Sequence, residues 1–143
     1  MINEILSGKR DTSSFGKSIK SNYVFNNKTI RCDSKLEHSC LSYLEEHYNV
    51  LDIERCNFSI AYTDFEGNER KYIPDFYVVT DTDIFIVECK YEKVNYILNE
   101  KWKHYVENSE IKKRVLAKYC DTNSFKMMWY TNITNKKYKN YKI

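Results

Sequence analysis

The sequence contains very little proline or glycine and no long apolar run. Its 143 residues include one proline and three glycines, which leaves little room for linkers or low-complexity segments. No stretch approaches the ~20 apolar residues of a membrane span. The N-terminal segment MINEILSGKR has too short an apolar run for a signal peptide. These absences predict a single domain over residues 1–143, located in the cytoplasm and without a membrane partner.

Paired cysteine motifs are also missing. The five cysteines are odd in number and none forms a C-x-x-C pair, so we expect reduced thiols that mostly pack in the core. Cys32, His38, Cys40 and His47 lie close together in the sequence. Their spacing fits no usual zinc pattern, and we therefore predict no zinc site.

The residues that are present indicate a globular chain with an uneven charge distribution. Apolar residues make up 42% and aromatic residues 15%, which is typical of a folded domain. Residues 1–30 carry five basic and two acidic side chains, residues 31–100 seven and fifteen, and residues 101–143 eleven and three. This distribution suggests a basic surface that binds a polyanion around an acidic pocket. Solvated helix faces and a charged tail are the simpler explanation of the charges alone.

The pattern along the chain predicts an α/β fold. The segment SKLE (34–37) matches a capping box, in which Glu37 serves the helix start. Pro74 cannot donate to a sheet ladder, so we expect a bulge there that re-aims Asp75. The order α, β, β, β, α, β predicts a central mixed sheet flanked by helices, with the last strand parallel. The expected parts are a basic N-terminal arm (1–30), a core (31–131) and a basic tail (132–143). Within the core we expect a helix at 34–48, strands at 57–63, 70–80 and 82–90, helices after 93 and from 108 or 109, and a strand at 125–130.

The segment IFIVECK (84–90) carries the most specific chemical signal. Residues i and i+2 of a strand share a face, so Glu88 and Lys90 project together while Cys89 points into packing. An antiparallel hairpin would bring Asp75 alongside Glu88. Two close carboxylates repel each other unless a cation lies between them, and oxygen ligands select Mg²⁺ or Mn²⁺. The backbone carbonyl of Cys89 is a further candidate ligand.

Lys90 would then orient a metal-bound water or stabilise charge on a phosphate. The alternative is that Glu88 and Lys90 form a solvated ion pair worth under about 1 kcal/mol, and that Glu37 only caps its helix. Basic residues that could contact nucleic acid follow on a predicted helix and in the lysine- and tyrosine-rich tail, although the tail could equally be disordered. These candidates are Lys112, Lys113, Arg114, Lys118, Lys136 and Lys137.

Four segments together resemble the PD-(D/E)XK nuclease superfamily. They are SKLE (34–37), YIPDF (72–76), VECK (87–90) and AKYC (117–120). The similarity covers about residues 31–131 and is greatest to TnsA-type endonuclease domains of transposons and to phage head-completion nucleases. It implies the restriction-endonuclease-like αβββαβ core. It also implies a phage or mobile-element protein of the host cytoplasm, and the length favours a stand-alone enzyme.

The resemblance also implies roles for the site residues. Glu37, Asp75 and Glu88 would be the acidic residues and Lys90 the catalytic lysine. Asp75 and Glu88 would bind Mg²⁺, with Glu37 as an additional candidate ligand, and the reaction would be hydrolysis of a DNA phosphodiester. A structure-selective enzyme that cuts junctions or flaps, working as a homodimer with two-fold related sites, is one alternative. A non-catalytic DNA-binding or assembly factor is another.

Overall fold

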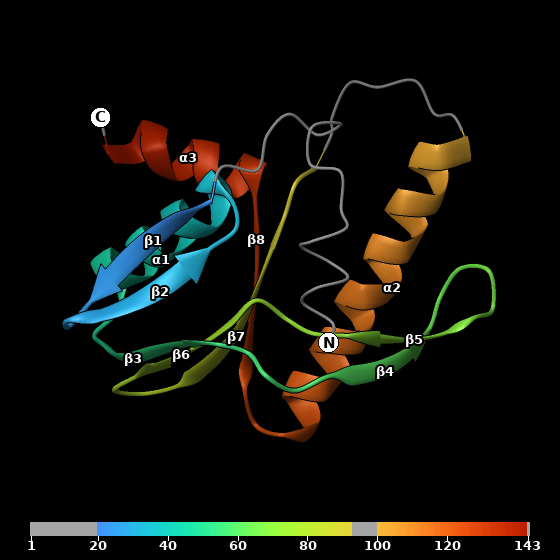
Figure 1. Cartoon of the computed structure of the whole chain (residues 1–143), viewed down its shortest axis with the longest axis horizontal. Coiled ribbons are helices and arrows are strands. Elements are labelled where there is room, and N and C mark those ends of the chain that lie inside the picture. The colour runs from blue at the N-terminus through green and yellow to red at the C-terminus, as the bar shows by residue number, and fades with distance from the viewer. Residues whose placement is uncertain (1–19, 93–99, 143) are drawn as a thin grey trace.

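The computed structural model describes residues 20–92 and 100–142, with the chain path shown in Figure 1. No helix in these ranges is long and apolar enough to cross a membrane. The elements in chain order are β1 (Ser21–Phe25), β2 (Lys28–Cys32), α1 (Lys35–His47), β3 (Val50–Arg55), β4 (Ile60–Thr63), β5 (Glu69–Tyr72), β6 (Phe76–Thr80), β7 (Ile84–Lys90), α2 (Glu100–Thr122), β8 (Lys126–Thr131) and α3 (Asn132–Lys142).

A four-stranded mixed sheet forms the centre of the molecule. Its strand order is β3-β6-β7-β8; β3–β6 and β6–β7 are antiparallel, whereas β7–β8 is parallel. A parallel neighbour requires a long crossover, and α2 lies between β7 and β8 in the chain. The predicted α/β class, mixed sheet and parallel last strand are confirmed.

Strand β7 separates two apolar clusters because its side chains alternate between the faces of the sheet. Phe85 and Val87 pack in one cluster with α1 and the β1–β2 hairpin, and Cys89 borders it. Ile86 packs in the other with Leu116 of α2. Full burial of such a side chain contributes roughly 1.5–3 kcal/mol. The strand is therefore anchored from both sides, and Figure 1 shows α1 and α3 on one face and α2 on the other.

The predicted helix cap is confirmed. Ser34 has extended backbone angles and its side chain accepts a hydrogen bond from the Glu37 N–H at 3.1 Å. The Glu37 carboxylate accepts from the N–H of Asp33 at 2.8 Å, one residue earlier than the reciprocal bond of a standard capping box. Leu41 and Leu44 then bury the inner face of α1.

The prediction of an irregular arm over residues 1–30 is wrong for residues 21–30. They form a hairpin that continues to Cys32, with Asn26 and Asn27 at φ 48° and 65°, as a tight two-residue turn between antiparallel strands requires. Tyr23 and Phe25 of the hairpin are buried. Residues 1–19 of the expected arm lie outside the described residues.

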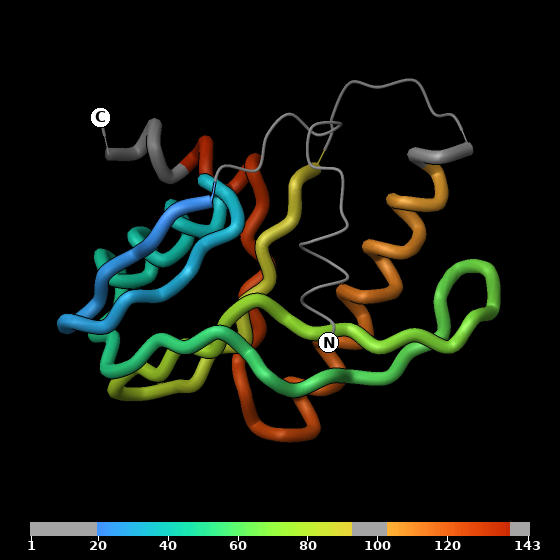
Figure 2. The backbone as a smooth tube through the Cα atoms, in the orientation of Figure 1, coloured from blue at the N-terminus to red at the C-terminus, as the bar shows by residue number. Residues whose placement is uncertain are grey.

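The strands before β7 differ from expectation: one was not predicted, one is shorter and one is divided into two. The segment before residue 60 contains β3, which was not predicted, and the expected strand 57–63 is reduced to β4. The expected strand 70–80 is interrupted between Tyr72 and Phe76, where β5 ends and β6 begins. Among the described strands, β4 and β5 pair only with each other. Figure 2 shows this pair leaving the main sheet and running along α2.

The helices also differ from expectation. α2 is one continuous helix rather than two. The Asn108 side chain does not cap a second helix but accepts a hydrogen bond from the Phe65 N–H at 2.7 Å. The start of the helix predicted after residue 93 lies outside the described residues. Residues 132–142 are helical rather than a tail. The N–H of Thr134 donates to Thr131 Oγ1 at 3.2 Å and satisfies one donor of the first turn.

Candidate active site

Asp75 lies in the break between β5 and β6, and its backbone is held on both sides. Its N–H donates to the Val87 carbonyl at 3.1 Å, and its own carbonyl accepts the Cys56 N–H at 3.0 Å. Pro74, directly before it, is fully buried and has no N–H to leave unsatisfied. The backbone at Asp75 is therefore fixed relative to β7.

The Asp75 side chain binds a backbone N–H of β7 just beyond the point where the β6–β7 strand register ends. The strand register ends at Phe76 opposite Val87, and beyond the Asp75–Val87 backbone bond Asp75 Oδ2 accepts the Cys89 N–H at 2.8 Å. The N–H and C=O of one strand residue point to the same side, so the Cys89 carbonyl also faces the side of Asp75. The Cys89 side chain packs against the α1 cluster, as predicted.

Glu88 is buried at the end of β7, and its carboxylate is incompletely satisfied. Its Oε2 lies 3.8 Å from the Lys90 Nζ. Among the described residues no hydrogen bond of good geometry reaches its Oε1 or the adjacent Tyr72 hydroxyl, although the two groups lie close enough to interact weakly with each other. Burial raises the pKa of Glu88, and Lys90, Tyr72 and Lys112 oppose this shift. An orphaned buried carboxylate oxygen is costly, so this position favours an additional cationic or protic partner.

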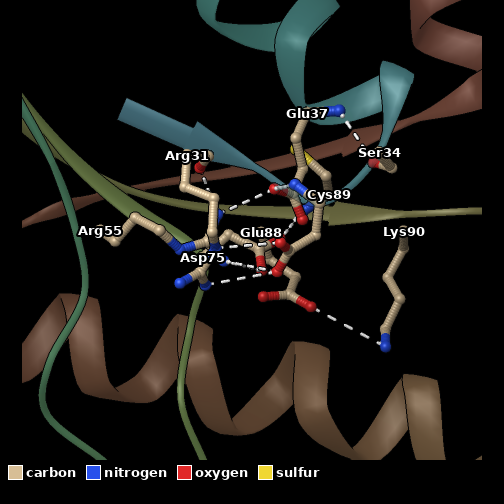
Figure 3. A network of polar contacts seen from close by, with 9 residues as sticks. Arg31, Ser34, Glu37, Arg55, Asp75, Glu88, Cys89 and Lys90 are labelled. Atoms are coloured by element: carbon tan, nitrogen blue, oxygen red, sulfur yellow. Dashed lines mark hydrogen bonds and ion pairs between the residues drawn. The ribbon is translucent and has the colours of Figure 1, made fainter. Parts of the chain in front are cut away.

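The Asp75 carboxylate is also largely buried beside other negative charges. Burial raises its pKa well above the ordinary value, and repulsion from Glu88 and Glu37 adds to the shift. The Cys89 N–H and Arg55 lower it only in part. Two repelling carboxylates with an orphaned oxygen fit a hard divalent cation. Figure 3 shows both carboxylates near the end of β7.

The donor set available for such a cation is small. Within residues 20–92 and 100–142, no group of three or more His, Cys, Asp or Glu side chains is arranged to hold a metal. The protein ligands would therefore be Asp75 and Glu88, with the Cys89 carbonyl and water completing the shell. Mg²⁺ can be bound by so few protein ligands, because it commonly keeps several waters and takes one or two carboxylates.

Glu37 faces this region from α1, but its carboxylate is engaged. Besides the Asp33 N–H, its Oε1 accepts from Arg55 Nη1 at 2.9 Å. Figure 3 shows Arg55 entering beside Asp75, and its Nη2 lies 3.6 Å from both Asp33 Oδ2 and Asp75 Oδ1. Glu37 could ligate a metal only through its other oxygen or after Arg55 moves.

Arg55 is the residue of the candidate site that sequence reasoning missed. Its guanidinium forms ion pairs with three carboxylates and lies over the Phe76 ring, 4.8 Å from the centroid. Burial lowers its pKa, but attraction to Glu37 and the other carboxylates raises the pKa above the ordinary value. The only available signal was its place at the end of a short β-branched run, VLDIER (50–55), which was not assigned as a strand.

Lys90 extends from β7 toward the α2 side of the sheet (Figure 3). Its Nζ lies 5.8 Å from the Tyr105 ring centroid, on α2, as well as 3.8 Å from Glu88. Burial lowers the pKa of Lys90, but Glu88 and its other neighbours raise it overall. The ammonium is thus held charged on the same face as Glu88, as the strand period predicted.

The six predicted nucleic-acid contacts are not brought together. Lys112 faces the site, whereas the Lys113 Nζ lies 5.9 Å from the Trp129 ring centroid. Burial lowers the pKa of Lys112 to about 8, and repulsion from Lys90 contributes. The remaining four residues are exposed, two on α2 and two on α3, across the sheet: Arg114, Lys118, Lys136 and Lys137.

Comparison with known proteins gives no closer definition. No profile of a known protein family matches the chain, and no curated protein is significantly similar to it. The fold and site therefore define the class: an α/β protein with a mixed sheet whose central strand ends in a buried carboxylate and lysine.

Proposed function

We propose that this protein is a Mg²⁺-dependent DNA endonuclease of the PD-(D/E)XK type. The observation that carries the proposal is the buried Glu88 carboxylate, with one oxygen unpartnered among the described residues, beside Asp75 and Lys90. The elements α1, β3, β6, β7, α2 and β8 follow the αβββαβ order of the restriction-endonuclease-like core. The resemblance of the motifs to TnsA-type and phage nucleases supports the same assignment.

Each residue of the proposed active site would have a separate role. Asp75, Glu88 and the Cys89 carbonyl would hold Mg²⁺, which supplies charge stabilisation at the phosphate and a more acidic water. Lys90 stays protonated and orients the attacking water by a hydrogen bond. Arg55 holds Glu37 and Asp75 in place by ion pairs at 2.9 Å and 3.6 Å. Preorganisation of this kind by a rigid strand is what a hydrolytic site requires.

Cleavage of plasmid DNA tests the proposal. We expect cutting with Mg²⁺ or Mn²⁺ and none in EDTA, and at least about a 100-fold loss for Asp75→Asn or Lys90→Met. Asp81→Asn, in an exposed turn, and Lys126→Met, at the far end of the sheet, are matched controls that should cut normally. Equal rates for the site and control variants would refute the assignment.

Metal binding is tested separately from cleavage. A cation that binds only the folded state raises its stability by RT ln(1 + [L]/Kd), about 2.7 kcal/mol at 100 times Kd. Mg²⁺ should therefore raise the Tm of the parent protein relative to EDTA and leave that of Glu88→Gln unchanged. Glu110→Gln, exposed on α2, should respond like the parent. An identical rise in Glu88→Gln would place the cation elsewhere.

A second function is favoured by Arg55. Its guanidinium already offsets part of the negative charge of Glu37 and Asp75, so the fold could persist without metal as a non-catalytic DNA-binding or assembly factor. In that case labelled DNA would bind without being cut and Mg²⁺ would not change the Tm. A panel of linear, nicked, branched and single-stranded DNAs would also identify a junction- or flap-selective enzyme. Sedimentation of the same samples would detect a homodimer.

A further inference from the structure

Lys112 occupies an unusual position for a surface lysine. It lies one and two helical turns before the buried residues Leu116 and Cys120, so it is on the face of α2 that packs toward the sheet. Its side chain is half-buried, and its Nζ lies 5.6 Å from the ring centroid of the buried Tyr72. Tyr72 in turn lies next to Glu88. The helix thus presents an ammonium group to the candidate site.

The charges around this ammonium are incompletely matched. Glu88 and Asp75 attract it, while Lys90 and Arg70 repel it. In the part of the chain that the structure describes, Lys112 forms no ion pair within 4 Å. Removing a cation from water without a close anion is unfavourable, and a cation–π contact contributes only about 0.5–2 kcal/mol. A bound anion would supply the missing partner.

Lys90 and Lys112 differ in what already holds them. Lys90 is within ion-pair distance of Glu88, whereas Lys112 is outside it, so Lys112 is the more available of the two for an incoming anion. A DNA phosphate drawn to the two lysines would place its charge against Lys112 without breaking an existing ion pair. Of the predicted nucleic-acid-binding side chains that the structure describes as exposed on α2 and α3, none has a contact with Asp75 or Glu88: Arg114, Lys118, Lys136 and Lys137.

We propose that Lys112 binds a non-bridging oxygen of the phosphodiester that is cut and stabilises the charge that develops there. The catalytic part of this inference rests on the proposed function. During hydrolysis the water oxygen bonds to phosphorus and loses a proton to solvent, while the bond to the leaving oxygen breaks and that oxygen takes up a proton. Lys112 keeps its own proton throughout and acts as a fixed charge.

The experiment compares Lys112→Met with Lys126→Met and Lys112→Arg. We expect Lys112→Met to reduce kcat by at least about 100-fold, as loss of one transition-state donor does. Lys126→Met should leave kcat unchanged, and Lys112→Arg should recover at least tenfold over Lys112→Met because the charge is restored. The Tm of Lys112→Met should not fall, since a cation without an ion pair is removed. A kcat within threefold of Lys126→Met, no recovery in Lys112→Arg, or a large fall in Tm would overturn the inference.

A binding measurement separates this inference from the proposed function. Fluorescence anisotropy with a labelled duplex in Ca²⁺ or EDTA needs no cleavage. Loss of one phosphate contact should reduce the slope of log Kd against log salt by about 0.9 for Lys112→Met, with no change for Lys126→Met. If the parent cuts no DNA but this difference appears, the nuclease assignment fails and the phosphate contact stands. An unchanged slope overturns the contact.

Discussion

At the residue scale, Arg55 decides how the acidic groups coexist. Its guanidinium lies 2.9 Å from Glu37 and 3.6 Å from Asp33 and Asp75, and its side chain is 24% exposed. Three carboxylates in a partly buried space would repel one another without it. The acidic centre is therefore built around a fixed internal cation, and a metal would add to that arrangement rather than replace it.

We predict that Arg55→Met lowers the free energy of unfolding in EDTA by about 3 kcal/mol, because breaking a buried ion pair leaves uncompensated charge. Urea denaturation at pH 7 measures this loss. The matched control is Arg31→Met: Arg31 also binds Asp33, at 3.0 Å, but its side chain is 47% exposed. Exposed pairs contribute about 0–1 kcal/mol. Equal losses in the two variants would show that burial does not distinguish them.

At the element scale, the β4–β5 hairpin depends on Asp64. Its Oδ1 accepts the N–H groups of Glu66 and Asn68 at 2.9 Å and 2.8 Å, and its Oδ2 accepts Arg70 Nε at 2.7 Å. Gly67, in the same loop, has φ 89°, a backbone conformation that glycine adopts without strain. This buried carboxylate shapes the turn, and the hairpin then packs Phe65 against His104 of α2.

The pH dependence of stability follows from Asp64. Its bond to Arg70 and the two backbone donors lower its pKa to about 2 from an ordinary value of 3.8. A depressed pKa contributes stability that is complete above the unfolded value and is lost as pH falls toward the folded value. Asp64→Asn should therefore lower the Tm at pH 7, and the difference from the parent should shrink between about pH 4 and 2. Thermal unfolding monitored by circular dichroism measures it.

The control for this variant is Glu69→Gln on the same hairpin. Glu69 is exposed, and its described side-chain hydrogen bond is from Thr63 at 3.3 Å. The Tm of Glu69→Gln should match that of the parent protein at every pH. A Tm difference for Asp64→Asn that stays constant down to pH 2 would contradict an electrostatic origin.

At the scale of the whole molecule, the N-terminal hairpin is part of the main core. Tyr23, Phe25 and Ile30 belong to the same buried cluster as Leu41 of α1 and Val78 of the sheet. Lys28 of β2 also binds Asp52 of β3 at 2.7 Å. The apolar contacts belong to the cluster on the α1 face of the sheet, and the ion pair joins the hairpin to the edge strand β3.

Neighbouring residues of β1 test this integration. Phe25 is 4% exposed and Val24 is 65% exposed. We predict that Phe25→Ala lowers the free energy of unfolding by about 3–5 kcal/mol, as core phenylalanine truncations do, and that Val24→Ala stays within about 0.5 kcal/mol. Chemical denaturation measures both. A small loss in Phe25→Ala would mean that the hairpin is an accessory to a core that is stable without it.

Much of the fold could be predicted, and the failures have physical causes. The cap at Ser34, the buried strand β7 and the parallel strand β8 follow from local pattern and chain connectivity. Asn108 looked like a helix cap because the side chain suits one, but a tertiary partner, the Phe65 N–H, binds it instead. The β1–β2 hairpin was missed because Asn26 and Asn27 are less evident turn residues than glycine.

Local sequence is enough to predict how the side chains are arranged at the end of β7. The two-residue period of a strand places Glu88 and Lys90 on one face and Cys89 on the other, and proline at position 74 necessarily interrupts the ladder before Asp75. The tertiary structure alone decided which charges surround them. Arg55 and Lys112 are distant in the chain from Glu88, and no local period relates them to it. Arg55 reaches Asp75 because β3 pairs with β6, and Lys112 comes near Glu88 because α2 packs against the sheet.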